Sequence, residues 1–235
     1  MNRILFKKLK SGYRPVKEMS FLVMVLLFGM NTPWMNPAWA EEKPGLAILP
    51  FVSERGEDPE RGNICPLCKR VYRSGEILSG SQNAMTKLLY QKMETMDRFK
   101  ILPLEKVEES SSLQDMKRFK EKPIPLSLQA GQDLGVHFIL VGFLFRFEER
   151  IGSSIGVTRP ASVSFDLHLF RLRDGLEVWR SKFDETQRPL SENLLQIGSF
   201  VRRKAHWLTA EELASVGMGE VLKKLPGINE LEEMK

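Results

Sequence analysis

The 235-residue sequence is poor in the side chains that most often carry chemistry. It has two cysteines and three histidines, and no two of the histidines share a metal-ligand spacing. It contains no glycine spacing that cradles phosphate, and no second metal-binding pair beside its single C-x-x-C. These absences argue against a phosphate-loop enzyme and a zinc finger. We therefore expect a non-enzymatic protein with no catalytic residue, cofactor, metal or small-molecule substrate evident.

Charge of one sign is also missing from most of the chain. The 35 basic and 30 acidic residues give a formal charge of +5 and a pI of 9.2. Residues 1–40, however, hold six of the basic residues and one acidic residue, which leaves 29 of each sign in the remainder. A neutral domain lacks the electrostatic footprint of a phosphate-backbone binder, so we expect no nucleic-acid partner.

Residues 1–40 have the anatomy of a secretory signal peptide. A basic stretch precedes the apolar run from Phe21 to Phe28, and Ala38 and Ala40 fit a small-residue cleavage site before Glu41. An uncleaved membrane anchor is the alternative, but about ten apolar residues are too few to cross a hydrocarbon core of about 30 Å. No cysteine stands at the cleavage point, so the segment does not match an acylated lipoprotein signal.

The rest of the chain lacks any further run that is long and apolar enough for a membrane helix. We predict cleavage near Ala40/Glu41, no transmembrane helix after cleavage, and a single domain over residues 41–235. The expected location of this domain is the periplasm.

The first half of this domain has the pattern of a βαβ unit. Leu46–Phe51 is a short apolar run bounded by turn formers, apolar residues recur at helical spacing from about Ser81, and Phe99–Pro103 follows as a second strand. Val136–Glu148 begins as an apolar run and ends in alternation, which predicts a central strand that continues along an edge. Gly135 stands where a preceding helix would end.

The second half predicts an antiparallel hairpin followed by helices. Ser162–Leu172 alternates between apolar and polar residues, the turn Arg173–Gly175 follows, and Leu176–Phe183 returns as a partner strand, so both strands should be half-solvated. Helices are expected over about 190–203 and from Thr209, which begins a capping-box pattern. The predicted fold is a mixed α/β domain of two or three layers, with about five strands, parallel in its first half.

Several apolar segments follow the pattern of a known family. They are Leu46–Phe51 with the helix after it, Phe99–Pro103 leading into Leu104–Val107, Leu134–Gly142, and the Arg173–Gly175 turn before Val178-Trp179. Residues 45–185 thereby resemble the TolB amino-terminal domain and its relatives CsgG and LpoB. The resemblance implies a periplasmic α/β domain that binds other cell-envelope proteins. The sequence differs from these relatives in three respects. It shows no lipoprotein cysteine at the predicted cleavage point, as CsgG and LpoB have, no membrane hairpins of a CsgG-type pore, and no propeller repeats of TolB.

The sharpest local motif is Cys65-Pro66-Leu67-Cys68, within a segment from Ser53 to Arg73 that is expected to be a surface loop. Two cysteines at this spacing form a local disulfide, a dithiol redox pair or half of a zinc site. The disulfide is the simplest interpretation for an exported chain. The redox pair would make the protein a thiol–disulfide oxidoreductase, which is the alternative function, and zinc would require two ligands that the spacing does not supply.

The three histidines, His137, His168 and His206, are expected to be structural or surface residues. A partner surface is instead predicted at the loop from Ile151 to Pro160, where apolar and arginine side chains lie beside exposed strand edges. The candidate partner-binding residues are Ile151, Val157, Arg159, Pro160, Arg180 and Arg188. The function predicted from the sequence is an exported envelope interaction module, accessory to peptidoglycan synthesis, outer-membrane assembly or secretion.

Overall fold

The computed structural model describes residues 42–54, 62–110, 113, 116–187 and 206–234. The predicted signal peptide, Arg188 and the predicted helix over 190–203 lie outside these residues. The chain divides into two units, Met1–Glu42 and Lys43–Lys235, and the second holds all of the described residues except Glu42. None of the helices within the described ranges has both the length and the apolar composition that a membrane span requires.

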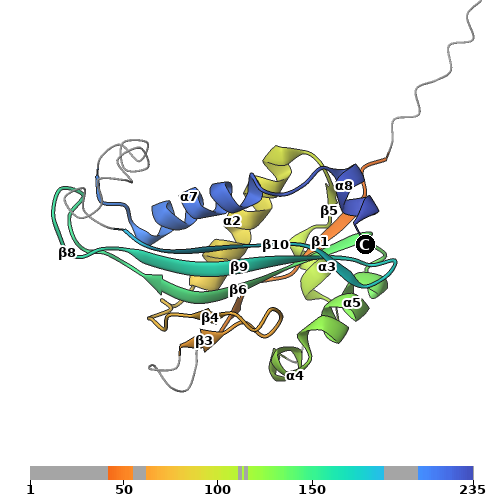
Figure 1. The fold of residues 1–235 in the computed structure, drawn as a ribbon, viewed down its shortest axis with the longest axis horizontal. Coiled ribbons are helices and arrows are strands. Elements are labelled where there is room, and N and C mark those ends of the chain that lie inside the picture. Colours follow the sequence, from red (N-terminus) through yellow and green to blue (C-terminus); the bar gives the residue numbers. More distant parts are fainter. Residues whose placement is uncertain (1–41, 55–61, 111–112, 114–115, 188–205, 235) are drawn as a thin grey trace, which may run out of the picture. The chain divides into compact units, whose positions relative to one another are not determined.

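The second unit is built on a six-stranded mixed sheet (Figure 1). Strand β6 lies at its centre, with β1 and β2 parallel to it on one side and β9 antiparallel on the other. Strand β5 pairs in parallel with β1, and β10 pairs antiparallel with β9. The strands are β1 (Gly45–Ile48), β2 (Val52–Ser53), β5 (Lys100–Ile101), β6 (Phe138–Glu148), β9 (Ser162–Arg171) and β10 (Leu176–Thr186). The predicted α/β class and its parallel and antiparallel halves are confirmed.

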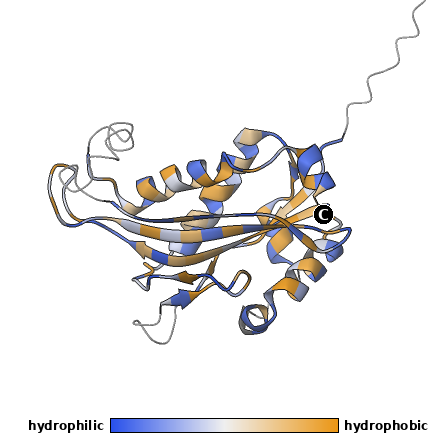
Figure 2. Cartoon of the chain, in the orientation of Figure 1, coloured by the Kyte–Doolittle hydropathy of each residue, from blue (hydrophilic) through white to orange (hydrophobic). Residues whose placement is uncertain are grey.

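Helices cover both faces of this sheet, so the unit has three layers. Helices α2 and α7 lie on one face, and α3, α4 and α5 lie on the other together with a small hairpin, β3–β4 (Figure 1). Hydrophobic residues occur along the strands, and the helices carry both hydrophobic and hydrophilic residues (Figure 2). The elements are α2 (Ser81–Met96), α3 (Leu104–Glu108), α4 (Met116–Glu121), α5 (Pro123–Asp133), α7 (Ala210–Leu222), α8 (Ile228–Glu233), β3 (Asn63–Ile64) and β4 (Val71–Tyr72).

Strand β6 is apolar because it has partner strands on both sides and covering layers on both faces. It is buried along its whole length except at Glu148. The prediction that its second half runs along an edge was wrong. Arg146, which produced the apparent alternation, is only 2% exposed, and its guanidinium donates to Ser162 Oγ and to the Arg73 carbonyl.

Two further expectations are corrected by the β3–β4 hairpin. The segment from Ser53 to Arg73 is not simply a surface loop, because β3–β4 packs on the sheet and the Tyr72 ring stacks on that of Phe145 with centroids 3.9 Å apart. The same layer covers β9, which is therefore buried along its whole length rather than half-solvated. Strand β10, at the sheet edge, has both buried and exposed residues and is half-solvated as predicted.

The predicted turn and cap signals are confirmed. Gly135 after α5 and Gly175 in the β9–β10 turn have φ of 64° and 71°, where a side chain would be strained. Thr209 and Glu212 form a complete capping box at the start of α7. These local signals mark the end of α5, the β9–β10 turn and the start of α7.

Candidate functional site

A stripe of polar side chains runs along the face of β9 that lies under the β3–β4 hairpin. Alternate residues of a strand share a face, so Ser162, Ser164, Asp166 and His168 all point to this side. All four are buried. Since a buried polar group needs a partner, the covering hairpin has to supply matching groups.

The turn between β3 and β4 brings both cysteines onto this stripe. Cys65 N–H donates to the Arg70 carbonyl at 2.9 Å, and Lys69 N–H donates back to the Cys65 carbonyl at 3.0 Å. Lys69 has a φ of 60°, which turns the chain sharply after Cys68. Cys68 N–H points at Cys65 Sγ, 3.4 Å away. The tight turn therefore holds the two sulfur atoms on one side of the hairpin.

Four potential ligand atoms converge beneath this turn. They belong to Cys65, Cys68, Asp166 and His168, and all lie within 4.8 Å of one another. Cys65 Sγ is 3.4 Å from His168 Nε2, Cys68 Sγ is 3.8 Å from Asp166 Oδ2, and the Asp166 and His168 atoms are 3.2 Å apart. Such a donor set can bind a transition metal.

An outer ring of polar groups surrounds the four side chains. His168 Nδ1 lies 2.6 Å from Oε1 of Glu177 on β10, so this nitrogen points away from the sulfur atoms. Tyr72 Oη donates to Asp166 Oδ2 at 2.9 Å. The other carboxylate oxygen of Asp166, Oδ1, is buried without a hydrogen-bond partner.

Burial and hydrogen bonding shift the pKa values of these groups. Burial raises the pKa of Cys65 to about 11, although the hydrogen bond to His168 opposes this shift. Burial would by itself lower the pKa of His168, but its hydrogen bonds, first of all that to Asp166, raise the value to about 11. A protonated, buried thiol differs from the activated thiolate of a redox enzyme, whose pKa lies below the ordinary range.

Sequence reasoning found two of these four residues and missed the other two. Cys65 and Cys68 are free thiols in the structure, and the local disulfide remains a prediction. Asp166 was assigned to a half-solvated strand face, and His168 was expected to be a structural or surface residue. The D-x-H spacing was the available signal, because residues i and i+2 of a strand share a face.

The predicted partner-binding loop is a short hairpin made of β7 (Ile151–Gly152) and β8 (Val157–Arg159). Its apolar residues are unusually open to solvent: Ile151 is 51% exposed and Ile155, in the turn, is 92% exposed. Arg159 is also exposed, while Val157 and Pro160 are partly buried.

Arg180 is not part of this hairpin. It pairs in register with His168 near the middle of the β9–β10 ladder and lies 3.7 Å from Glu177. The structure therefore places Arg180 beside the cysteine cluster. Arg188, the last of the predicted partner-binding residues, lies outside the described residues.

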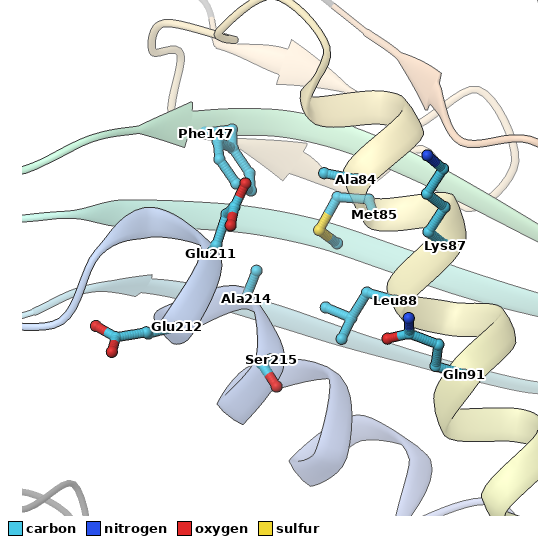
Figure 3. A pocket seen from close by; sticks show the side chains of 10 residues that line it. All are labelled: Ala84, Met85, Lys87, Leu88, Gln91, Phe147, Glu211, Glu212, Ala214 and Ser215. Carbon is cyan, nitrogen blue, oxygen red and sulfur yellow. The ribbon is translucent and has the colours of Figure 1, made fainter.

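A groove of about 380 Å³ lies on the opposite face, between α2 and α7. Met85 and Leu88 point from α2 toward α7, and Phe147 and Ala214 add to the apolar lining (Figure 3). Its carboxylates include Glu212, which accepts from Thr209 N–H in the capping box. This lining is typical of two packed helices rather than of a catalytic pocket.

The backbone of this chain was compared with those of solved structures, and its sequence with those of known proteins. No protein-family model and no curated protein matches the sequence. PelC of Paraburkholderia phytofirmans, solved as a dodecamer, is similar at 12% identity and a TM-score of 0.42, over 81% of this chain and 92% of that one. The LpoB carboxyl-terminal domain of Salmonella enterica is similar at 10% identity and a TM-score of 0.38, over 72% and 96%. Lipoprotein GNA1162 of Neisseria meningitidis is similar at 11% identity and a TM-score of 0.36, over 69% and 98%.

Proposed function

We propose that this chain is an exported, non-enzymatic interaction domain of the cell envelope that binds a partner protein through the β7–β8 hairpin. The observation that carries the proposal is the exposure of Ile155, at 92%, together with that of Ile151 in the same hairpin, at 51%. Its role is accessory to peptidoglycan synthesis, outer-membrane assembly or secretion, in keeping with the family resemblance of residues 45–185.

The hairpin tip is braced by four hydrogen bonds, which favours recognition over adventitious exposure. Ser153 Oγ accepts from the backbone N–H groups of Ile155 and Gly156, and Ser153 N–H donates to the Gly156 carbonyl at 2.8 Å. Trp207 N–H also donates to the Ser154 carbonyl at 2.9 Å, which ties the turn to the segment before α7. A preordered apolar tip loses little conformational entropy on binding.

The chemistry of the tip defines the partner. Two isoleucines fit an apolar pocket, and Arg159, which is in register with Ile151 in the β7–β8 ladder, has 49% of its side chain exposed and lies 4.0 Å from Glu76. A pocket with an acidic rim would complement this combination, since charged groups at a rim set orientation and association rate. The partner is therefore a folded protein with an apolar cleft and carboxylates at its edge.

The rival function, thiol–disulfide exchange, fits the geometry less well. Cys65 is fully buried, and the Cys65–Cys68 turn leads into β4 rather than into a helix whose amino terminus would stabilise a thiolate. The neighbour of Cys68 Sγ is the Asp166 carboxylate, whose Oδ2 lies 3.8 Å away. A non-enzymatic role is consistent with these surroundings.

Site-specific photo-crosslinking tests the proposal. A photoreactive phenylalanine analogue at position 155 of the full chain, produced in its own cells, should give one discrete protein adduct, and the same analogue at Ile124 on α5 should not. Ile124 is a matched control because it is also an exposed isoleucine, at 40%. The purified partner should then bind Ile155→Asp at least tenfold more weakly, with the melting temperature of the variant unchanged.

Other outcomes would overturn the assignment. An adduct formed equally from both positions, or from position 64 on β3 alone, would move the surface away from the hairpin. Flotation of the protein with vesicles that depends on Ile155 would assign the hairpin to lipid instead. Recovery of a mature protein that begins at Glu41 in the periplasmic fraction would support export, whereas an unprocessed cytoplasmic chain would contradict it.

A further inference from the structure

We propose that Cys65, Cys68, Asp166 and His168 form a binding site for Zn²⁺ that fastens the β3–β4 hairpin to strand β9. The site does not depend on the function proposed above. Its two halves come from positions about 100 residues apart in the chain, since Cys65 and His168 are separated by 103 residues. The proposal rests on the identity of the donor atoms, their spacing, and the groups that surround them.

The donor set suits zinc. Two sulfurs, one imidazole nitrogen and one carboxylate oxygen are ligands that Zn²⁺ accepts in tetrahedral geometry, whereas soft sulfur ligands disfavour Mg²⁺ and Ca²⁺. Zinc–ligand bonds of about 2.0 to 2.3 Å place neighbouring ligand atoms of a tetrahedron about 3.3 to 3.8 Å apart. The three separations given above, 3.2, 3.4 and 3.8 Å, match this spacing closely.

The outer ring provides the support that metal ligands usually have. A ligating histidine commonly donates its other ring N–H to a carboxylate, which fixes the ring and its tautomer. Here Nε2 of His168 faces the sulfur atoms while Nδ1 lies 2.6 Å from Glu177 Oε1. Tyr72 Oη holds the Asp166 carboxylate, and Cys68 N–H points at Cys65 Sγ, so each type of ligand has an orienting contact.

A second, independent observation is the unsatisfied carboxylate. Asp166 is only 2% exposed, and its Oδ1 is buried without a hydrogen-bond donor. Leaving such an acceptor unpaired is costly, and a cation beside the carboxylate would offset that cost. A divalent cation would also favour the thiolates over the protonated thiols.

A zinc centre with two thiolates and a carboxylate carries a net negative charge, and basic side chains near the site would complement it. Lys182 lies opposite Asp166 in the β9–β10 ladder, and its ammonium stands 5.9 Å from the centre of the Tyr72 ring. Arg180 is opposite His168. Four protein ligands leave no open coordination position, so the site is structural and its role is to hold the covering layer in place.

Metal content and cobalt substitution test this inference on the full mature chain. The purified protein, with both thiols reduced, should contain one Zn²⁺ per chain. Replacement by Co²⁺ should give the thiolate-to-cobalt charge-transfer band and the intense visible bands of a tetrahedral site. Removal of the metal with a chelator should lower the melting temperature, and added Zn²⁺ should restore it.

Variants distinguish a built site from adventitious binding. Cys68→Ser and His168→Ala should lose stoichiometric metal, while His206→Ala, which changes a histidine outside the cluster, should retain it. Glu177→Gln keeps all four ligands and should weaken zinc affinity by about 10- to 100-fold. This variant keeps the proposal testable even if the ligand variants fail to fold.

Three results would overturn the proposal. They are a reduced, folded protein that takes up no Zn²⁺ or Co²⁺, a cobalt spectrum without sulfur ligation, and a protein from the periplasm in which Cys65 and Cys68 are disulfide-bonded and metal is absent. Equal affinity of wild type and Glu177→Gln would also contradict the role of the outer ring.

Discussion

The guanidinium Nη2 of Arg146 lies 2.7 Å from Oδ1 of Asp184, although a whole strand separates the two residues. Both are in register with Ser164 of β9, Arg146 from β6 and Asp184 from β10. The small side chain of Ser164 leaves room for the guanidinium to reach across β9. The ion pair therefore ties the central strand to the edge strand of the sheet.

Loss of the carboxylate should destabilise the domain clearly. The Arg146 side chain is 2% exposed. Asp184→Ala would leave the guanidinium charge of Arg146 buried, with Ser162 Oγ and the Arg73 carbonyl as its remaining acceptors. We expect the free energy of unfolding to fall by about 1–3 kcal/mol, the usual cost of an unpaired buried group. Urea denaturation measures it.

The matched control for this ion pair is Lys43→Ala. The Lys43–Asp97 pair is equally short, at 2.6 Å, but its side chains are 46% and 80% exposed. Screening by water should keep the loss below about 1 kcal/mol. Equal losses in the two variants would show that burial does not decide the strength of the Arg146 pair.

Two glycines of helix α7 should respond in opposite ways to alanine. A Cβ at Gly217 would lie 2.5 Å from the Phe183 ring, whereas a Cβ at Gly219 would have nothing within 4 Å. Gly217→Ala should destabilise the domain by about 1–3 kcal/mol through overpacking. Gly219→Ala should stabilise it by up to about 1 kcal/mol, because alanine favours helix. Thermal unfolding measures both changes in stability. Stabilisation by Gly217→Ala together with destabilisation by Gly219→Ala would contradict the packing of α7 on β10.

The start of α7 depends on the Thr209 side chain. Thr209 Oγ1 accepts from Glu212 N–H at 3.1 Å, and the Glu212 carboxylate accepts from Thr209 N–H at 2.8 Å. Thr209→Ala should cost about 0.5–2 kcal/mol of stability, while Thr209→Ser keeps the acceptor and should cost little. If Thr209→Ser were as unstable as Thr209→Ala in thermal unfolding, the methyl group rather than the cap would be responsible.

Stability in acid should depend on Asp174. The side-chain hydrogen bond from Arg171 lowers the pKa of Asp174 below its ordinary value, and the same guanidinium donates to the Leu231 carbonyl of α8. A carboxyl whose pKa is lower in the folded state stabilises the fold above its unfolded pKa, and this contribution is lost as pH falls through the folded value. Asp174→Asn should therefore flatten the acid limb of stability against pH. Parallel curves for the variant and wild type would exclude this linkage.

Sequence patterns predicted the order and type of the main strands and helices, because these depend on the residues within each segment. The central position of Val136–Glu148, the alternation of Ser162–Leu172 and the capping box at Thr209 all follow from the composition of each segment. The composition of a segment does not show which other elements cover each face of the sheet. Asp166 and His168 alternate with apolar residues as they would on a wet face, and only the docking of β3–β4 buries them.

The site was half predicted for the same reason. The C-x-x-C motif is visible in the sequence, but its other two candidate ligands lie about 100 residues further along and become neighbours only through the β9 ladder. The segment carrying the cysteines has few apolar residues in periodic order, so its packing, through Tyr72 on Phe145, left little sequence signal.

The position of β6 at the centre of the sheet also determines the order in which the chain can assemble. Strands β6, β9 and β10 are consecutive neighbours along the chain apart from a short hairpin, so they form contacts of low sequence separation. Strand β1, by contrast, joins β6 across a loop of about ninety residues, as in the Gly45–His137 contact separated by 92 positions. Because loop closure has to precede such contacts, β1 should dock late. During synthesis the amino-terminal strand therefore has only the two-residue strand β5 to pair with, among the strands of this sheet described above, until the central strand has been made.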